Sequence, residues 1–166
     1  IIESVATAGA DVINGTSAPD WLQGLGGDDI LNGGAGNDML EGGADNDTLD
    51  GGGDTGSSGV DGDVLDGGDG IDTASYLSAG AADVAKLQGV SRQNTAGAGW
   101  DRLVDIENIV GSAFNDTLSG YNGTNALYGD EGNDLLNGLG GDDRIEGGEG
   151  SDTASYLGSE TGVAVD

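Results

Sequence analysis

The sequence predicts an all-β fold, a β-solenoid in which short parallel strands stack on one another. Three observations predict it: a nine-residue repeat, an acidic and an apolar residue at fixed places in that repeat, and glycine at 36 of 166 positions, against about 7% in an average protein. A period of nine matches neither an α-helix nor a coiled coil, and it is not the triplet of collagen. It matches a turn of about six residues followed by a strand of about three.

The repeats fall into two blocks, residues 15–75 with six repeats and residues 111–155 with five. Residues 51–57 lengthen the fifth repeat of the first block. With each repeat numbered one to nine, position six is acidic in every repeat but one, where it is Asn. The position-six residues are Asp20, Asp29, Asp38, Asp47, Asp63, Asp72, Asp116, Asn125, Asp134, Asp143 and Asp152.

Position eight is always apolar, which predicts a buried row along the solenoid. Its residues are Leu22, Leu31, Leu40, Leu49, Leu65, Ala74, Leu118, Leu127, Leu136, Ile145 and Ala154. In a three-residue strand the central side chain points one way and its neighbours the other, so position eight faces inward and positions seven and nine face water. Glycine in the turn supplies positive φ and close backbone approach. A single strand of this length is unstable, but stacked copies share a thin core.

The charge balance demands a counter-ion. The chain has 31 acidic and 4 basic residues, a formal charge of −27, and self-repulsion at this charge opposes a compact state. Such a surface should repel nucleic acid and anionic membranes, and no apolar run is long enough to cross a membrane. We therefore expect no nucleic-acid partner, no membrane insertion and a requirement for cations.

The repeat also predicts where the cations bind. If two repeats make one coil, each repeat lies beside the next but one, and two position-six carboxylates face each other across one strand spacing of about 4.8 Å. A divalent ion between them would turn repulsion into ligation. Hard oxygen ligands in a flexible turn suit Ca²⁺ better than Mg²⁺. Zinc prefers His or Cys ligands, and the chain has neither.

These repeats, of which GGAGNDMLE at residues 33–41 is representative, resemble the GGxGxDxUx nonapeptide of RTX (repeats-in-toxin) calcium-binding proteins. The resemblance implies a parallel β-roll with calcium between successive turns, and export by type I secretion. It pairs Asp20 with Asp38, Asp29 with Asp47, Asp38 with Asp63, Asp47 with Asp72, Asp116 with Asp134, Asn125 with Asp143, and Asp134 with Asp152. About seven Ca²⁺ are thus expected, the Asn125 site being the weakest.

The resemblance also implies that backbone carbonyls of the turn complete each site, those of positions one and three for one ion and those of two and four for the other. The carbonyls expected as ligands are those of Gly24, Gly26, Gly27, Gly33, Ala35, Gly36, Gly42, Ala44, Gly129, Glu131, Gly132, Gly138, Gly140, Gly141, Gly147, Glu149 and Gly150. Asp45 stands where most repeats have glycine, as either a further ligand or a tolerated turn residue.

Three segments lie outside the repeats. Residues 1–14 are expected to be a lead-in, and residues 156–166 the start of a further strand. Residues 76–110 break the period, and alternation in VAKLQGV and RLVDIENIV predicts longer strands. The segment is expected to be a wider coil that continues the roll, with a recognition patch or a linker as alternatives.

The sequence favours a calcium-dependent folding module of a larger secreted bacterial protein, the remainder of that polypeptide being its first partner. An adhesive or polysaccharide-binding accessory module is the alternative. Catalysis is not expected in this chain, because it lacks His, Cys and a GxSxG motif, and because equal aspartates in every repeat do not single out an active site. Its parent could still be an enzyme.

Overall fold

The computed structural model describes residues 3–53, 62–87, 91–95 and 97–158. These ranges contain seventeen strands and no helix, so no helix in the described chain could cross a bilayer. The strands are β1 (Glu3–Val5), β2 (Val12–Asn14), β3 (Trp21–Gly26), β4 (Ile30–Asn32), β5 (Met39–Ala44), β6 (Thr48–Asp50), β7 (Val64–Asp69), β8 (Thr73–Ser75), β9 (Val84–Lys86), β10 (Gln93–Asn94), β11 (Trp100–Val104), β12 (Asn108–Val110), β13 (Thr117–Ser119), β14 (Ala126–Gly132), β15 (Leu135–Asn137), β16 (Arg144–Gly150) and β17 (Thr153–Ser155).

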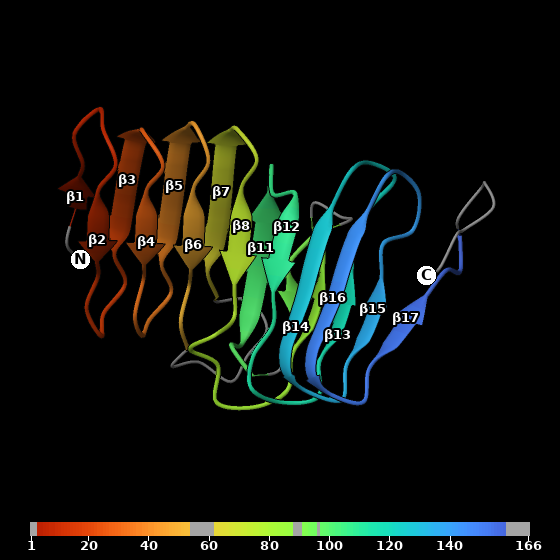
Figure 1. Cartoon of the computed structure of the whole chain (residues 1–166). Helices are drawn as coiled ribbons and strands as arrows, with labels where there is room; N and C mark the ends of the chain where they lie inside the picture. The colour runs from red at the N-terminus through yellow and green to blue at the C-terminus, as the bar shows by residue number, and fades with distance from the viewer. Residues whose placement is uncertain (1–2, 54–61, 88–90, 96, 159–166) are drawn as a thin grey trace.

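The strands form three sheets, and within each sheet they follow one another along the long axis of the roll (Figure 1). The first sheet has the order β1-β3-β5-β7-β11-β10, the second β16-β14-β12-β8-β6-β4-β2, and the third β17-β15-β13-β9. The strand pairings are parallel except that of β10 with β11. The chain alternates between the first and second sheets in the first block, and between the second and third sheets in the second block, which gives the expected all-β parallel roll.

The register shows that each repeat lies beside the next but one. Leu22 pairs with Leu40, 18 residues on, and Leu31 pairs with Leu49. Across the lengthened repeat the offset grows, so that Leu40 pairs with Leu65. The ladder of position-eight residues therefore stays in line despite the insertion, of which residues 54–57 lie outside the described part of the chain.

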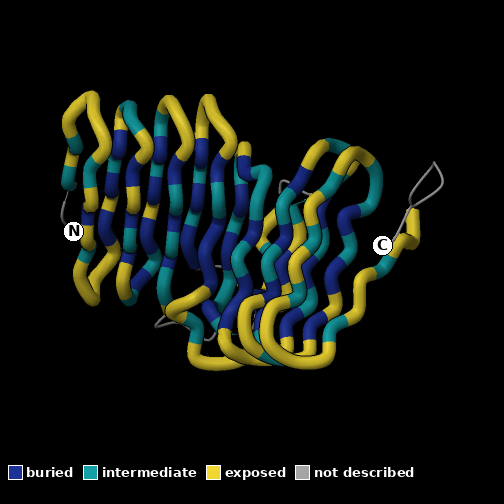
Figure 2. Tube along the Cα trace, viewed as in Figure 1, coloured by how far each residue is buried: buried dark blue, intermediate teal, exposed yellow. Residues whose placement is uncertain are grey.

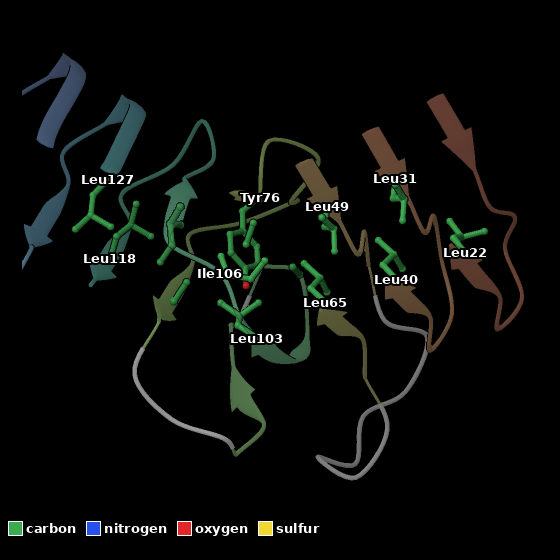
Figure 3. Packing of buried hydrophobic residues seen from close by; sticks show 14 of the residues in the cluster. Leu22, Leu31, Leu40, Leu49, Leu65, Tyr76, Leu103, Ile106, Leu118 and Leu127 are labelled. Carbon is green, nitrogen blue, oxygen red and sulfur yellow. The ribbon is translucent and has the colours of Figure 1, made fainter. Parts of the chain in front are cut away.

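Position eight forms the core. Figure 3 shows the leucines in a row, with Tyr76 and Ile106 where the two blocks meet. The nine position-eight residues from Leu22 to Leu136 are each at most 1% exposed, whereas Ile145 is half-buried and Ala154 exposed in β16 and β17, the last strands of their sheets. Figure 2 shows buried segments along the strands and exposed turns at both edges of the roll. Each buried leucine contributes about 2 kcal/mol of transfer free energy.

Five strands of the repeat blocks are longer than the three residues expected. β3, β5, β7, β14 and β16 have six or seven residues and continue into the first three or four positions of the next turn. The turns on these edges pair from coil to coil, Leu25 with Gly43 and Asp130 with Gly148. Identical turns stacked in register satisfy their backbone groups this way, because buried N–H and C=O groups need partners.

Residues 1–14 are more than a lead-in. β1 and β2 pair in register with β3 and β4, Glu3 opposite Trp21 and Val12 opposite Ile30, so residues 3–14 form one further coil. At the other end, Tyr156 to Gly158 follow β17 without a strand, and residues 159–166 lie outside the described part.

Residues 76–110 lie within the roll but follow an unexpected path. After β8 the chain forms β9, which pairs with β13, and then returns to place β11 beside β7 and β12 beside β8. The prediction of longer strands holds only for the start of RLVDIENIV, where β11 has five residues. A turn at Asp105, where φ is 45°, separates β11 from the three-residue β12. The turn brings Ile109 onto Ala74, so the fixed width of the neighbouring coils overrides the local alternation.

Candidate metal sites between the turns

The position-six residues form ladders along the turns. In each of the seven predicted pairs, the backbone N–H of the earlier residue donates to the side chain of the later one. The distances from N to Oδ1 are 2.8 Å for Asp20 to Asp38, 2.8 Å for Asp29 to Asp47, 2.7 Å for Asp38 to Asp63, 2.8 Å for Asp47 to Asp72, 2.8 Å for Asp116 to Asp134, 3.0 Å for Asn125 to Asp143 and 3.1 Å for Asp134 to Asp152.

Position one is glycine because two oxygens occupy the space beside it. A Cβ on Gly33 would lie 2.6 Å from Asp38 Oδ2 and 2.7 Å from the carbonyl oxygen of Gly51, the position-one residue of the next coil. The same convergence of a position-six side-chain oxygen and a position-one carbonyl recurs beside Gly15, Gly24, Gly42, Gly111, Gly120 and Gly129. These seven glycines open the earlier repeat of the seven predicted pairs.

In several repeats the converging carboxylate has no hydrogen-bond donor. The Oδ2 atoms of Asp29, Asp47, Asp72 and Asp134 are buried without a partner. Burial, aided by the charges of Asp72, Asp29 and Asp28, raises the pKa of Asp47 from 3.8 to about 6. Burial also raises the pKa values of Asp72 and Asp134. A buried, ionised carboxylate without a partner is costly in free energy. A cation bound at these turns would remove that cost.

The residues present fit a hard cation. We call the space beside each of these position-one glycines, where the two oxygens converge, a cradle. Each cradle has a backbone carbonyl oxygen and a side-chain oxygen, a carboxylate except at Asn125, and such oxygens are the ligands that Ca²⁺ prefers. Within the described residues no three acidic side chains gather closely enough to hold a metal by themselves, so backbone carbonyls have to supply the remaining ligands. Of the predicted carbonyls, those of Gly33, Gly42, Gly129, Gly138 and Gly147 reach a cradle.

The other predicted carbonyls lie along the turn edges. Gly26 pairs with Ala44, Glu131 with Glu149 and Gly132 with Gly150 in the extended strands. Gly24 begins that part of β3, and Ala35 forms a bridge with Gly53. The remaining four are glycines. Gly27, Gly36 and Gly141 have positive φ, as do Gly132 and Gly150, and Gly140 lies in the turn before β16.

The opening repeats satisfy the position-six side chain differently. Thr16 donates to Asp20 Oδ2 through its backbone N (2.6 Å) and its Oγ1 (2.8 Å). Ser112 does the same for Asp116, from N to Oδ2 at 2.6 Å and from Oγ to Oδ1 at 2.9 Å. In the second repeat of the second block, the backbone N of Tyr121 likewise donates to Asn125 Oδ1 at 2.8 Å. These donors all stand at position two.

The conformation of position two separates the two kinds of repeat. Leu25, Gly43, Gly68 and Asp130 have positive φ, and they precede Asp29, Asp47, Asp72 and Asp134, whose Oδ2 atoms have no donor. Thr16, Ser112 and Tyr121 are not among the positive-φ residues, and their N–H groups donate. Asn125 also donates from Nδ2 to the Glu107 carbonyl at 2.9 Å, which supports its place as the weakest predicted site.

Sequence reasoning missed four acidic residues that occupy position six. Asp11 N donates to Asp29 Oδ1 (2.7 Å), Asp83 N to Asp116 Oδ1 (2.7 Å) and Asp72 N to Glu107 Oε2 (2.9 Å). Asp101 lies in β11 beside Asp63, whose carbonyl accepts from Arg102 N at 2.9 Å. The sequence did contain a signal for them, because each stands two residues before a buried apolar residue. The pairs are Asp11 and Ile13, Asp83 and Ala85, Asp101 and Leu103, and Glu107 and Ile109.

Asp45 is a turn residue that also bridges two coils. It adopts a φ of 76° and accepts from the backbone N of Gly27 at 3.1 Å. Asp tolerates the left-handed region better than most side chains, and the bond ties its turn to the preceding coil. No contact of its carboxylate with a cradle is observed.

The comparison with known families agrees with this geometry. The model of the RTX calcium-binding nonapeptide repeat matches four times, at residues 5–40, 25–58, 105–136 and 119–154. The first match includes the coil of β2, and the third includes Glu107. A search of curated proteins gave no match. With well over half of its residues in these matches and its carboxylates stacked between the turns, the chain belongs to the RTX calcium-binding repeat family.

Proposed function

We propose that this chain is a calcium-binding module of a larger secreted bacterial protein, exported by type I secretion, and that it folds when Ca²⁺ binds between its turns. The observation that carries the proposal is the set of buried Oδ2 atoms without a donor, at Asp29, Asp47, Asp72 and Asp134, each beside a position-one glycine. A bound cation would give each of these oxygens the positive partner that the protein does not supply.

The charge of the chain makes folding conditional. At −27 the chain repels itself, and the buried aspartates add to that cost. Outside the cell, sites with dissociation constants of about 10⁻⁴ to 10⁻³ M would be filled, and binding to the folded state alone stabilises it by linkage. Where free calcium is scarce, the same chain stays unfolded and able to pass through an exporter.

The structure supports about seven ions of unequal affinity. The pairs that begin at Asp29, Asp47 and Asp134 leave an Oδ2 without a donor, whereas those that begin at Asp20, Asp116 and Asn125 already have donors at position two. We therefore assign the tighter sites to the repeats in which this oxygen has no donor. They are the repeats of Asp29, Asp47, Asp72 and Asp134, which we call the interior repeats. The module acts by holding structure, with no catalytic role, and the remainder of the parent polypeptide is its constant partner.

Calorimetric titration of the chain with Ca²⁺ tests this function. We expect a stoichiometry near seven with at least two classes of affinity, and no comparable binding of Mg²⁺. A stoichiometry of one or two would contradict the assignment of an ion to each stacked pair, and no binding would contradict the function itself.

Accessory binding of an extracellular polysaccharide or surface is a second candidate function, and one cavity favours it. A cavity of about 360 Å³ is lined by Leu77, Val110, Tyr128, Asp130, Glu146 and Gly148. An aromatic ring beside two acidic side chains suits a sugar, although Arg144 stands 5.5 Å from the centroid of the Tyr128 ring. Binding of polysaccharides to the calcium-loaded chain, lost in Tyr128→Ala, would support it, and equal binding by both proteins would contradict it.

A further inference from the structure

The second sheet crosses from the first repeat block into residues 76–110 without a break. β8 pairs with β12, Ala74 opposite Ile109, and the carbonyl oxygen of Asp72 accepts from Asn108 N at 2.9 Å. β12 pairs in turn with β14 of the second block. The turn between Asp72 and the residues before β12 therefore lies where the two blocks are joined.

This turn repeats the geometry of the cradles with a glutamate. Asp72 N donates to Glu107 Oε2 at 2.9 Å, as other position-six residues donate to an aspartate. A Cβ on Gly67 would lie 2.5 Å from Asp72 Oδ2 and would clash with the carbonyl oxygen of Asp105. Asp105 thus takes the part played elsewhere by a position-one glycine, and its φ of 45° directs the backbone there.

An independent observation shows that this cradle needs a ligand. Asp72 is fully buried, and its Oδ2 has no hydrogen-bond donor. Thr16 and Ser112 solve this problem with an N–H and a hydroxyl in the opening repeats, but position two here is Gly68, with a φ of 98°. At Gly67, Asp72 Oδ2 therefore meets the Asp105 carbonyl oxygen without a donor to Oδ2, and Glu107 accepts from the backbone N of the same Asp72.

We propose that Asp72, Glu107 and the Asp105 carbonyl bind a further Ca²⁺, which clasps the first repeat block to the segment that leads into the second. The inference rests on the proposed function, because it assumes that the regular cradles bind calcium. It goes beyond it, because the site uses a ligand from residues 76–110. The clasp makes the two blocks fold as one unit.

Glu107→Gln tests the clasp, with Glu41→Gln as its matched control. Gln keeps the size of Glu107 and an oxygen to accept from Asp72 N, but it removes the charge. Glu41 is half-buried and also bonds to a neighbouring coil, accepting from Gln23 Nε2 at 2.7 Å, but it stands at position nine of its repeat, three residues after the position-six Asp38. Equilibrium dialysis at saturating Ca²⁺ counts the bound ions, and circular dichroism checks the fold.

We expect Glu107→Gln to bind one Ca²⁺ fewer than the unchanged chain and to need a few-fold more calcium to fold. Glu41→Gln should bind the full number. An undiminished count in Glu107→Gln, or equal losses in both variants, would overturn the clasp while leaving the proposed function intact. If the unchanged chain bound no calcium, the proposed function would fail instead.

A second variant covers the case in which Glu107→Gln does not fold. Glu107→Lys places an ammonium group where the ion would bind, so it should fold in calcium and bind one ion fewer. A full count in Glu107→Lys would overturn the clasp. Failure of both variants to fold in calcium would also count against it, because the loss of one site leaves the regular cradles able to hold the roll.

Discussion

The opening repeats and the interior repeats carry the same aspartate in two different electrostatic settings. In the repeat of Asp20, a threonine at position two donates twice to the carboxylate. In the repeat of Asp47, position two is Gly43 with a φ of 118°, and Asp47 Oδ2 has no donor. One backbone dihedral angle thus decides whether the protein or a cation satisfies the carboxylate. The opening repeats can be stable with their own donors, whereas the interior repeats depend on metal.

The largest expected effect comes from filling an interior cradle. In Gly42→Ala the new Cβ would lie 2.7 Å from the Gly67 carbonyl oxygen and 2.8 Å from Asp47 Cγ. We expect it to remove calcium from this cradle and to lower the free energy of unfolding in calcium by about 3 kcal/mol or more. Gly9→Ala, in the coil of the opening strands, meets no atom within 4 Å and should change stability by less than about 0.5 kcal/mol. Calcium counts and thermal unfolding of both variants check this, and equal effects would break the comparison.

The next largest effect is that of Asp47→Asn, whose effect on stability should change sign between calcium and chelator. In calcium, Asp47→Asn removes a ligand and should destabilise the roll by about 1–3 kcal/mol. In chelator the same variant removes an uncompensated buried charge, so it should favour residual structure. Asp20→Asn should be destabilising by about 1 kcal/mol in calcium and should not raise the residual structure in chelator, because it weakens the bonds from Thr16. Denaturant unfolding in calcium and circular dichroism in chelator measure this. An Asp47→Asn variant that behaves like Asp20→Asn would show that interior carboxylates are not special.

Acid should substitute for calcium in the interior repeats. Burial raises the pKa of Asp47 from 3.8 to about 6, and that of Asp83 to about 7. Between the unfolded and folded pKa values the folded chain binds more protons, so stability without metal falls as the pH rises through this window. The metal-free chain should therefore be most structured near pH 4 and lose that structure by about pH 7.

Circular dichroism of the metal-free chain against pH measures this loss. Saturating calcium, which neutralises the same carboxylates, should flatten the profile above pH 6. A metal-free chain that gains structure as the pH rises would have the opposite sign and would rule out this account of the aspartates.

The smallest effect is expected in the opening repeat. Thr16→Ala removes the hydroxyl bond to Asp20 but keeps the backbone N–H, so it should cost about 0.5–1.5 kcal/mol. The loss should be the same in calcium and at the acid pH where the metal-free chain folds, because the hydroxyl works without metal. Unfolding measurements under both conditions test this. A loss confined to calcium would mean that Thr16 acts through a bound ion.

Much of the roll could be predicted because its determinants are local to each repeat. Period, the inward position eight and the pairing of each repeat with the next but one follow from Asp and Leu at fixed spacing. Asp11 was missed because Ala6 replaces the position-one glycine that opens each of the eleven repeats, although Asp11 still stands two residues before Ile13. A search for an acid two residues before an apolar residue would have found it.

Two features depend on neighbouring coils and could not be predicted locally. RLVDIENIV alternates like one strand, yet the spacing set by Ala74 and Leu127 forces a turn at Asp105 and brings Glu107 to Asp72. The positive φ of Leu25 is not favoured by the residue itself. Leu25 pairs with Gly43 of the next coil, which also has a positive φ, so the stacked turns impose a conformation that leucine alone would avoid.

Far-ultraviolet circular dichroism of the unchanged chain at pH 7, first in chelator and then with added calcium, tests most directly whether the interior repeats need metal. Since Asp29, Asp47, Asp72 and Asp134 all bury an oxygen without a donor, we predict little β structure in chelator and a cooperative gain of it with calcium. A full β signal that persists in excess chelator and does not change when calcium is added would contradict this account.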